Sequence, residues 1–202
     1  KMQTELTQSG PLLNPDGTLA NIGWSRQPLL DCNLENAHFY NLRPLQRFRI
    51  KRWDYYAIFT PTRFFSATIA DLGYAGNIFV YTLDFETGEL HEEGLVIPFG
   101  SGINLERNPT GGIASFANDK VSLEFKIEGQ KKSLKVNWRN FDEGKGIQAE
   151  ITLQHPAAHE SINIVIPIGK KRFYDNTKIN CMPAEGFIQY GDAREELSPT
   201  SS

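Results

Sequence analysis

Several features that would point to a particular chemistry are scarce or missing in this chain of 202 residues. It has two cysteines, Cys32 and Cys181, which lie far apart and outside any Cys-x-x-Cys pair, so neither a redox motif nor a cysteine zinc site is indicated. We expect free thiols in a reducing compartment, which favours a cytoplasmic location. No apolar run approaches the roughly 18 residues of a membrane-spanning helix, so no transmembrane segment is expected.

An excess of charge of one sign is also absent. The chain has 21 Lys+Arg against 24 Asp+Glu, a net charge of −3. Proteins that bind nucleic acid usually carry a strong basic excess, so we expect no nucleic-acid partner. One local basic cluster could grip a phosphate or carboxylate, but a solvated strand edge is the favoured interpretation. It consists of Arg43, Arg47, Arg49, Lys51 and Arg52.

Motifs of cofactor and metal chemistry are missing as well. The loop Gly100–Leu105 begins like a dinucleotide-binding turn but lacks the third glycine, and no phosphate-binding loop or nucleophile elbow is present. His155 and His159 stand four residues apart without the glutamate of the zinc-protease motif. The sequence therefore predicts neither a cofactor nor a metal site.

What the chain does contain is the pattern of an all-β protein, with 40% hydrophobic and 22% charged residues. Short apolar runs alternate with Gly, Asn and Asp clusters, and later runs alternate apolar and polar residues with a period of two. This indicates antiparallel sheets that bury one face. The expected strands cover residues 53–59, 64–72, 78–85, 89–97, 121–127, 134–138, 147–153, 162–168 and 187–190.

Two of the early runs, 53–59 and 78–85, carry large apolar or aromatic side chains on both faces, so both faces need a cover. An antiparallel β-barrel would provide one, and so would a paired barrel or a sandwich. We expect an irregular N-terminal segment over 1–46 that packs on an antiparallel β body over 47–197. The body could be one barrel plus part of a second. A disordered tail is expected over 198–202.

Polar residues embedded in apolar runs supply the candidate site, because a buried carboxylate is costly unless it is paired or functional. Asp71 and Glu185 are candidates for a catalytic acid or base, and the alternative for each is an ion pair. Asp54, Asp71 and Glu185 would pair with Arg52, Arg63 and Lys178. The candidates for lining a ligand cavity are Trp53, Tyr55, Tyr56, Asp71 and Tyr81, with plain core packing as their alternative.

Five ordered segments, at 22–29, 51–56, 70–76, 83–88 and 178–186, together resemble the DUF2804 family of uncharacterised proteins. They include Gly23-Trp24-Ser25-Arg26-Gln27-Pro28 and Ala70-Asp71-Leu72-Gly73-Tyr74. Family members continue beyond the Ser-rich end of this chain, so the resemblance implies a C-terminally shortened form. At the level of the fold, the family is similar to carotenoid hydratase-like and lipocalin-like proteins, whose antiparallel barrels enclose apolar ligands.

These observations favour a protein that binds a lipidic or other apolar small molecule in a β-barrel cavity. One alternative is an enzyme of the hydratase or isomerase type that acts on such a molecule. The other is an interaction scaffold, which could self-associate through an exposed aromatic face. A filled interior would favour the scaffold.

Overall fold

The computed structural model describes residues 4–169 and 171–199, and its larger part consists of two antiparallel sheets. The first is a four-stranded meander in the order β4-β5-β6-β7. Its strands are β4 (Arg52–Phe59), β5 (Arg63–Asp71), β6 (Ala75–Asp84) and β7 (Leu90–Pro98). Each turn between them is short, as in the β6–β7 loop, where Gly88 adopts a positive φ of 74°.

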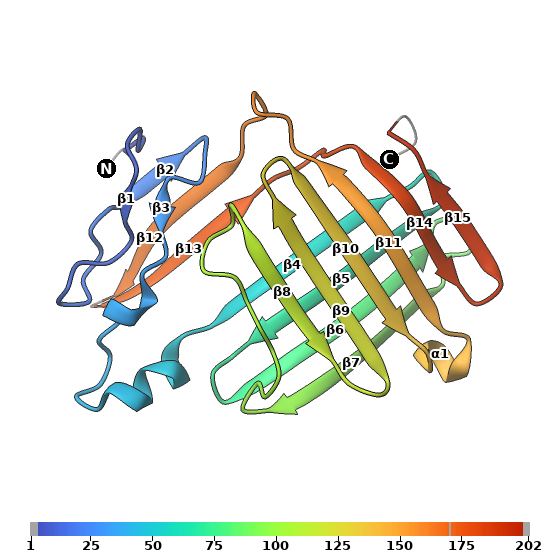
Figure 1. Cartoon of the computed structure of the whole chain (residues 1–202), viewed down its shortest axis with the longest axis horizontal. Helices are drawn as coiled ribbons and strands as arrows, with labels where there is room; N and C mark the ends of the chain where they lie inside the picture. The colour runs from blue at the N-terminus through green and yellow to red at the C-terminus, as the bar shows by residue number, and fades with distance from the viewer. Residues whose placement is uncertain (1–3, 170, 200–202) are drawn as a thin grey trace.

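The second sheet has six strands in the order β15-β14-β11-β10-β9-β8. Its strands are β8 (Gly112–Ala117), β9 (Val121–Glu128), β10 (Lys131–Trp138), β11 (Ile147–Gln154), β14 (Ala184–Tyr190) and β15 (Ala193–Leu197). A short turn labelled α1 (Phe141–Gly144) joins β10 to β11. Figure 1 shows this sheet in front of the four-stranded sheet, with the strands of the two crossing at a large angle.

The main core fills the space between these two sheets. It contains Phe65, Ile69 and Ile78 of the four-stranded sheet and Leu123 and Phe125 of the six-stranded sheet, all nearly inaccessible to solvent. In each strand these residues occupy alternate positions, because side chains of a β-strand point in turn to its two faces. The alternation of apolar and polar residues in the sequence therefore determines which face of each sheet is buried.

A smaller part of the fold is built around the N-terminal segment, at the left of Figure 1. Strand β2 (Gly23–Ser25) pairs with β12 (Ile162–Gly169), which pairs with β13 (Arg172–Lys178), and β1 (Gly10–Pro11) runs parallel to β3 (Leu30–Asp31). Two 3-10 helices follow, η1 (Leu34–Asn36) and η2 (Arg43–Arg49). A second core, centred on Leu12 and Leu13, lies beneath these elements.

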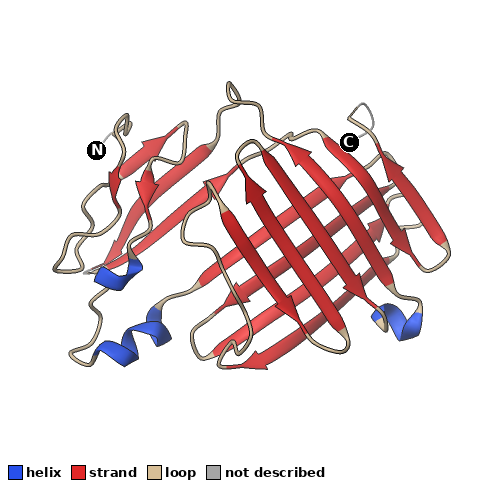
Figure 2. Cartoon of the chain, viewed as in Figure 1, coloured by secondary structure: helices blue, strands red, loops and turns tan. Residues whose placement is uncertain are grey.

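The predicted all-β class with antiparallel sheets is confirmed, as Figure 2 shows. Within the described residues no sheet closes into a barrel, because β4 and β7 remain the edges of one large sheet and β8 and β15 those of the other. The predicted tail falls partly on residues 200–202, which lie outside the described residues. No helix in the described part of the chain is long and apolar enough to cross a membrane.

Candidate functional site

The outer face of the four-stranded sheet collects aromatic and aliphatic side chains that no other part of the described chain covers fully. Strand register places these residues on the side opposite the main core. Phe59 is 61% exposed and Val96 is 70% exposed. We call this surface the aromatic face, and it consists of Trp53, Tyr55, Phe59, Phe64, Phe79, Tyr81, Leu83, Leu90 and Val96.

The rings of the aromatic face contact one another across neighbouring strands. Ring centroids lie 4.7 Å apart for Phe59 and Phe64, and 5.2 Å apart for Phe64 and Tyr81. The hydroxyls of Tyr55 and Tyr81 lie 3.4 Å apart. Partial burial, followed by the contact with Tyr81, raises the pKa of Tyr55 to about 12, so its phenol stays neutral. The face thus offers a continuous apolar surface with one pair of neighbouring hydroxyls.

Two further hydroxyls are buried in the strand at the centre of this face. Ser66 and Thr68 point to the same side of β5 as Phe64, and both are inaccessible to solvent. Within the described residues neither side-chain oxygen makes a hydrogen bond of standard geometry. A contact with Ser66 lowers the pKa of Tyr55 and opposes the effect of burial, so the Ser66 hydroxyl faces the Tyr55 phenol.

The structure brings together three of the five residues predicted to bind a ligand. Trp53, Tyr55 and Tyr81 share the aromatic face. Tyr56 points the other way, into the main core, where its ring meets Phe125 edge-on with centroids 5.0 Å apart. Asp71 lies at the end of β5, where its Oδ1 accepts a hydrogen bond of 2.7 Å from the backbone N–H of Gly73.

The two carboxylates considered as catalytic groups lie on different sheets. Asp71 shapes the β5–β6 turn, whereas Glu185 is exposed on the outer face of the six-stranded sheet, opposite Thr152 of β11. Of the predicted ion pairs, none is formed in the described residues. Arg63 instead contacts Asp84, with 3.4 Å between Nη2 and Oδ2. Nothing in these surroundings favours either carboxylate as an acid or base.

Sequence reasoning missed a buried cluster between the two large sheets. Asp54 of β4 contacts Glu106 of the β7–β8 loop and the hydroxyl of Tyr56, and Lys132 of β10 lies close to both carboxyls. The predicted partner of Asp54, Arg52, donates instead to the backbone carbonyls of residues 105 and 106. Asp54 and Glu106 are 52 positions apart, so no local pattern could have paired them.

The electrostatics of this cluster favour the protonated form of Asp54. Burial and the Glu106 carboxylate raise the pKa of Asp54 to about 7. Burial also lowers the pKa of Lys132, although the two carboxyls oppose that shift. Oδ2 of Asp54 and Oε2 of Glu106 are buried without a hydrogen-bond partner in the described residues. Since these oxygens are closed to solvent, the cluster joins the loop to the sheets and offers no access to a substrate.

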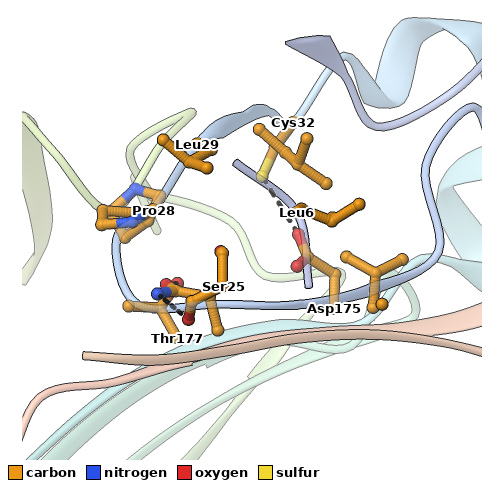
Figure 3. Close-up of a pocket in the computed structure, with 12 residues that line it drawn as sticks. Leu6, Ser25, Pro28, Leu29, Cys32, Asp175 and Thr177 are labelled. Atoms are coloured by element: carbon orange, nitrogen blue, oxygen red, sulfur yellow. Dashed lines mark hydrogen bonds between the residues drawn. The ribbon is translucent and has the colours of Figure 1, made fainter. Parts of the chain in front are cut away.

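Figure 3 shows a small pocket between the N-terminal segment and β12–β13. The Cys32 thiol donates a hydrogen bond to Oδ2 of Asp175 with 3.3 Å between the two atoms. Burial and this carboxylate raise the pKa of Cys32 to about 12, so the thiol is a poor nucleophile. The volume of about 20 Å³ holds little more than a water molecule, which excludes a lipid-sized ligand.

A polar cavity of about 240 Å³ lies where β7 meets α1. His91 Nδ1 lies 3.2 Å from Oδ1 of Asp142, and Lys145 Nζ lies 2.7 Å from its Oδ2, which also accepts the Tyr190 hydroxyl. The hydrogen bond from Lys145 is the main cause of the lowered pKa of Asp142. The cluster ties the β10–β11 connection to β7 and β14. No group of three or more possible metal ligands occurs in the described residues.

Comparison with known proteins identifies the family of this chain but assigns it no activity. Residues 3–202 match the family described as Domain of unknown function (DUF2804). The chain belongs to the DUF2804 family. No curated protein and no solved structure matches it. The DUF2804 membership confirms the resemblance seen in the sequence, and the family description assigns no activity that the geometry could be tested against.

Proposed function

We propose that this DUF2804 protein is an interaction module that docks an apolar protein surface on the aromatic face, and that a second copy of the chain is the partner. The observation that carries this proposal is the composition of the face. Its outward positions on β4–β7 are aromatic, aliphatic or small except for the amide Asn77 and the carboxylate Glu92, and of these positions only Glu92 is charged. Large exposed apolar patches mark interaction sites, and aromatic residues are enriched there.

The shape of the face favours a protein surface over a small molecule. Small ligands are held in concave pockets that cover most of their surface. The pocket of Figure 3 lies elsewhere, and the polar cavity beside β7 reaches this face only at its edge, through Leu90 and Glu92. The interior between the sheets is filled by side chains such as Phe65 and Phe125. A ligand cavity inside a closed barrel, our first expectation, therefore has less support than docking on the open face.

The size of the face also suits a sheet-on-sheet dimer. Four strands of about nine residues span roughly 30 Å by 15 Å, which is roughly 450 Å² before the relief of the side chains is added. A standard interface takes about 800 Å² from each partner, so the whole face would be used, and the relief of its side chains would have to supply the rest of the area. A nearly uncharged surface is complementary to itself across a two-fold axis, because no like charges oppose one another.

Sedimentation velocity of the purified chain over a range of concentrations tests this proposal. We expect a monomer–dimer equilibrium that the double variant Phe59→Lys/Val96→Lys shifts to monomer. Both side chains are largely exposed, so the fold should persist. Each substitution appears twice in a symmetric dimer and brings like charges together, so dissociation should become at least about 100-fold more favourable.

The matched control is Ile162→Lys, which replaces an apolar side chain that is 52% exposed on β12, away from the aromatic face. It should leave the dimer intact. A wild-type chain that stays monomeric, or a dimer that the control disrupts as strongly as the double variant, contradicts the proposal.

A second candidate function is the binding of a lipidic or other apolar small molecule on the same face. The paired hydroxyls of Tyr55 and Tyr81 support it, because they offer a polar handle within an apolar surface. Titration with a fluorescent polyene fatty acid tests this candidate. Saturable binding by a monomer that weakens in Tyr81→Phe would favour the small molecule. An enzymatic role of the hydratase or isomerase type has no comparable support.

A further inference from the structure

A second exposed surface lies at the end of the four-stranded sheet near η2, which Figure 2 shows in blue at the lower left. Three segments meet there: η2 with the loop before it, the β5–β6 turn, and the residue after β7. Leu42 is 65%, Phe99 63% and Tyr74 57% exposed. We call this surface the basic corner, and it consists of Tyr40, Leu42, Arg43, Leu45, Arg47, Arg49, Lys51, Tyr74 and Phe99.

Specific contacts hold these segments together. Arg47 donates through Nη2 to the carbonyls of Gly73, at 3.4 Å, and of Phe99, at 3.0 Å. Lys51 Nζ lies 3.9 Å from the ring centroid of Tyr74. Gly73 has a positive φ of 80°, and a Cβ there would come within 2.0 Å of the Arg47 carbonyl oxygen. Glycine at this position therefore allows η2 to lie against the turn.

The loop before η2 is fixed in the same way. The side chain of Gln46 accepts hydrogen bonds from the backbone N–H groups of residues 39 and 40, and donates to the carbonyls of Tyr40 and Leu42. These four contacts hold the loop that presents Tyr40 and Leu42. The exposed apolar side chains of the corner are thus presented by an ordered backbone.

The arginines of the basic corner differ from most others in the chain in lacking acidic partners. Within the described residues, Arg43, Arg47 and Arg49 have no carboxylate within 4.0 Å. By contrast, each of four other arginines forms an ion pair with at least one carboxylate: Arg26, Arg63, Arg107 and Arg194. Asp71 of the β5–β6 turn lies near Lys51, so the three arginines supply the net positive charge of the corner, on a chain whose net charge is −3.

We infer that the basic corner docks this protein reversibly on an anionic phospholipid surface, with its arginines at the headgroups and Leu42 and Phe99 inserted among the upper acyl chains. Exposed leucine and aromatic side chains flanked by arginines have the composition of surfaces that bind at a membrane interface. Each basic residue near an anionic leaflet strengthens binding by about fivefold, and the effect falls off within the screening length of the salt.

The same composition argues against nucleic acid as the partner. A polyanion groove needs a run of basic residues over a larger area, and the remaining surface of this chain is acidic overall. Leu42, Leu45 and Phe99 would stay in water on a duplex backbone, whereas a bilayer interface buries them. Charge and exposed apolar side chains together thus favour the lipid surface.

Co-sedimentation of the purified chain with vesicles tests this inference. We expect binding to vesicles of phosphatidylcholine and phosphatidylserine, little binding to phosphatidylcholine alone, and weaker binding as salt rises. The variant Arg43→Ala/Arg49→Ala should weaken binding about 25-fold, since each arginine accounts for about fivefold. Arg47 is left in place because it holds the turns together. Leu42→Ser should weaken binding at unchanged salt dependence.

The matched control is Lys131→Ala/Lys135→Ala, which removes the same charge from the outer face of the six-stranded sheet. Its affinity for the vesicles should stay within about twofold of wild type, because these residues lie away from the corner. Three outcomes would overturn the inference: equal loss in the control, equal binding to both kinds of vesicle, or tighter binding to a duplex DNA oligonucleotide than to the anionic vesicles.

Discussion

The two large sheets bury similar inner faces and present opposite kinds of outer face. Outward positions of β9, β10 and β11 alternate acidic, basic and amide side chains, such as Glu124, Lys135 and Gln148. Outward positions of β4–β7 carry the aromatic face, with a single charge at Glu92. The inner faces of both sheets supply the main core, so core packing does not explain why their outer faces differ. The aromatic face is therefore the surface on which the proposed docking function rests.

The outer face of the six-stranded sheet is suited to contact with water because it carries charged side chains. Lys135 of β10 stands between Glu124 of β9 and Glu150 of β11, so opposite charges face each other across the strands. Such pairs add a few tenths of a kcal/mol to about 1 kcal/mol each. The four-stranded sheet has no such arrangement among its outward residues. Its exposed rings pack on one another and, at Trp53, on Tyr174 of β13, with ring centroids 6.2 Å apart.

The largest expected effect separates inner from outer phenylalanines. Phe125→Ala removes a side chain that is 1% exposed and packs against Tyr56, so it should lower the free energy of unfolding by about 3–5 kcal/mol. Phe59→Ala removes a ring that is 61% exposed and should change it by less than about 1 kcal/mol. Urea denaturation of monomeric protein measures both. Equal losses would show that the aromatic face belongs to the folding core.

The second expected effect concerns Asp54, an acidic residue of β4 that lies on the inner side of the four-stranded sheet. Its folded pKa of about 7 lies above the ordinary value of 3.8, so the folded state holds its proton longer than the unfolded state does. The stabilisation is complete below about pH 4 and is lost as pH rises to about 7. Asp54→Asn should remove this loss, so the free energy of unfolding should vary with pH by about 3–4 kcal/mol less over that range.

The control for this experiment is Glu150→Gln on the charged outer face, which is exposed and should leave the pH dependence of unfolding unchanged. Glu106, Lys132 and Tyr56 face Asp54 and stay in place in both proteins. If Asp54→Asn retains the full wild-type slope between pH 4 and 7, the proton is not held by this pair.

How much of this could be predicted depended on whether the signal was local. Strands such as β9 and β11 were found because their alternation is clean, but β13 and β15 were missed because sequences such as Ala-Arg-Glu-Glu-Leu are polar on both faces. Trp53, Tyr55 and Tyr81 were proposed as ligand-binding residues from their aromatic character, and they lie on one face of the sheet. Tyr56 was not, since consecutive residues of a strand face opposite sides. The contact between Asp54 and Glu106 depends on the crossing of two sheets, which no local pattern encodes.

The smallest expected effect tests the charged outer face itself. Lys135→Glu would place three carboxylates side by side across β9, β10 and β11, because Lys135 stands opposite both Glu124 and Glu150. Like charges at opposed positions destabilise a sheet by less than about 1 kcal/mol per pair, and salt screens them. Urea denaturation should therefore show a loss of about 1 kcal/mol at low salt that shrinks at high salt. Lys135→Gln, which removes the attraction without adding repulsion, should lose about half as much. A loss that does not respond to salt would mean that packing of the lysine stem, rather than charge, sets the stability of this face.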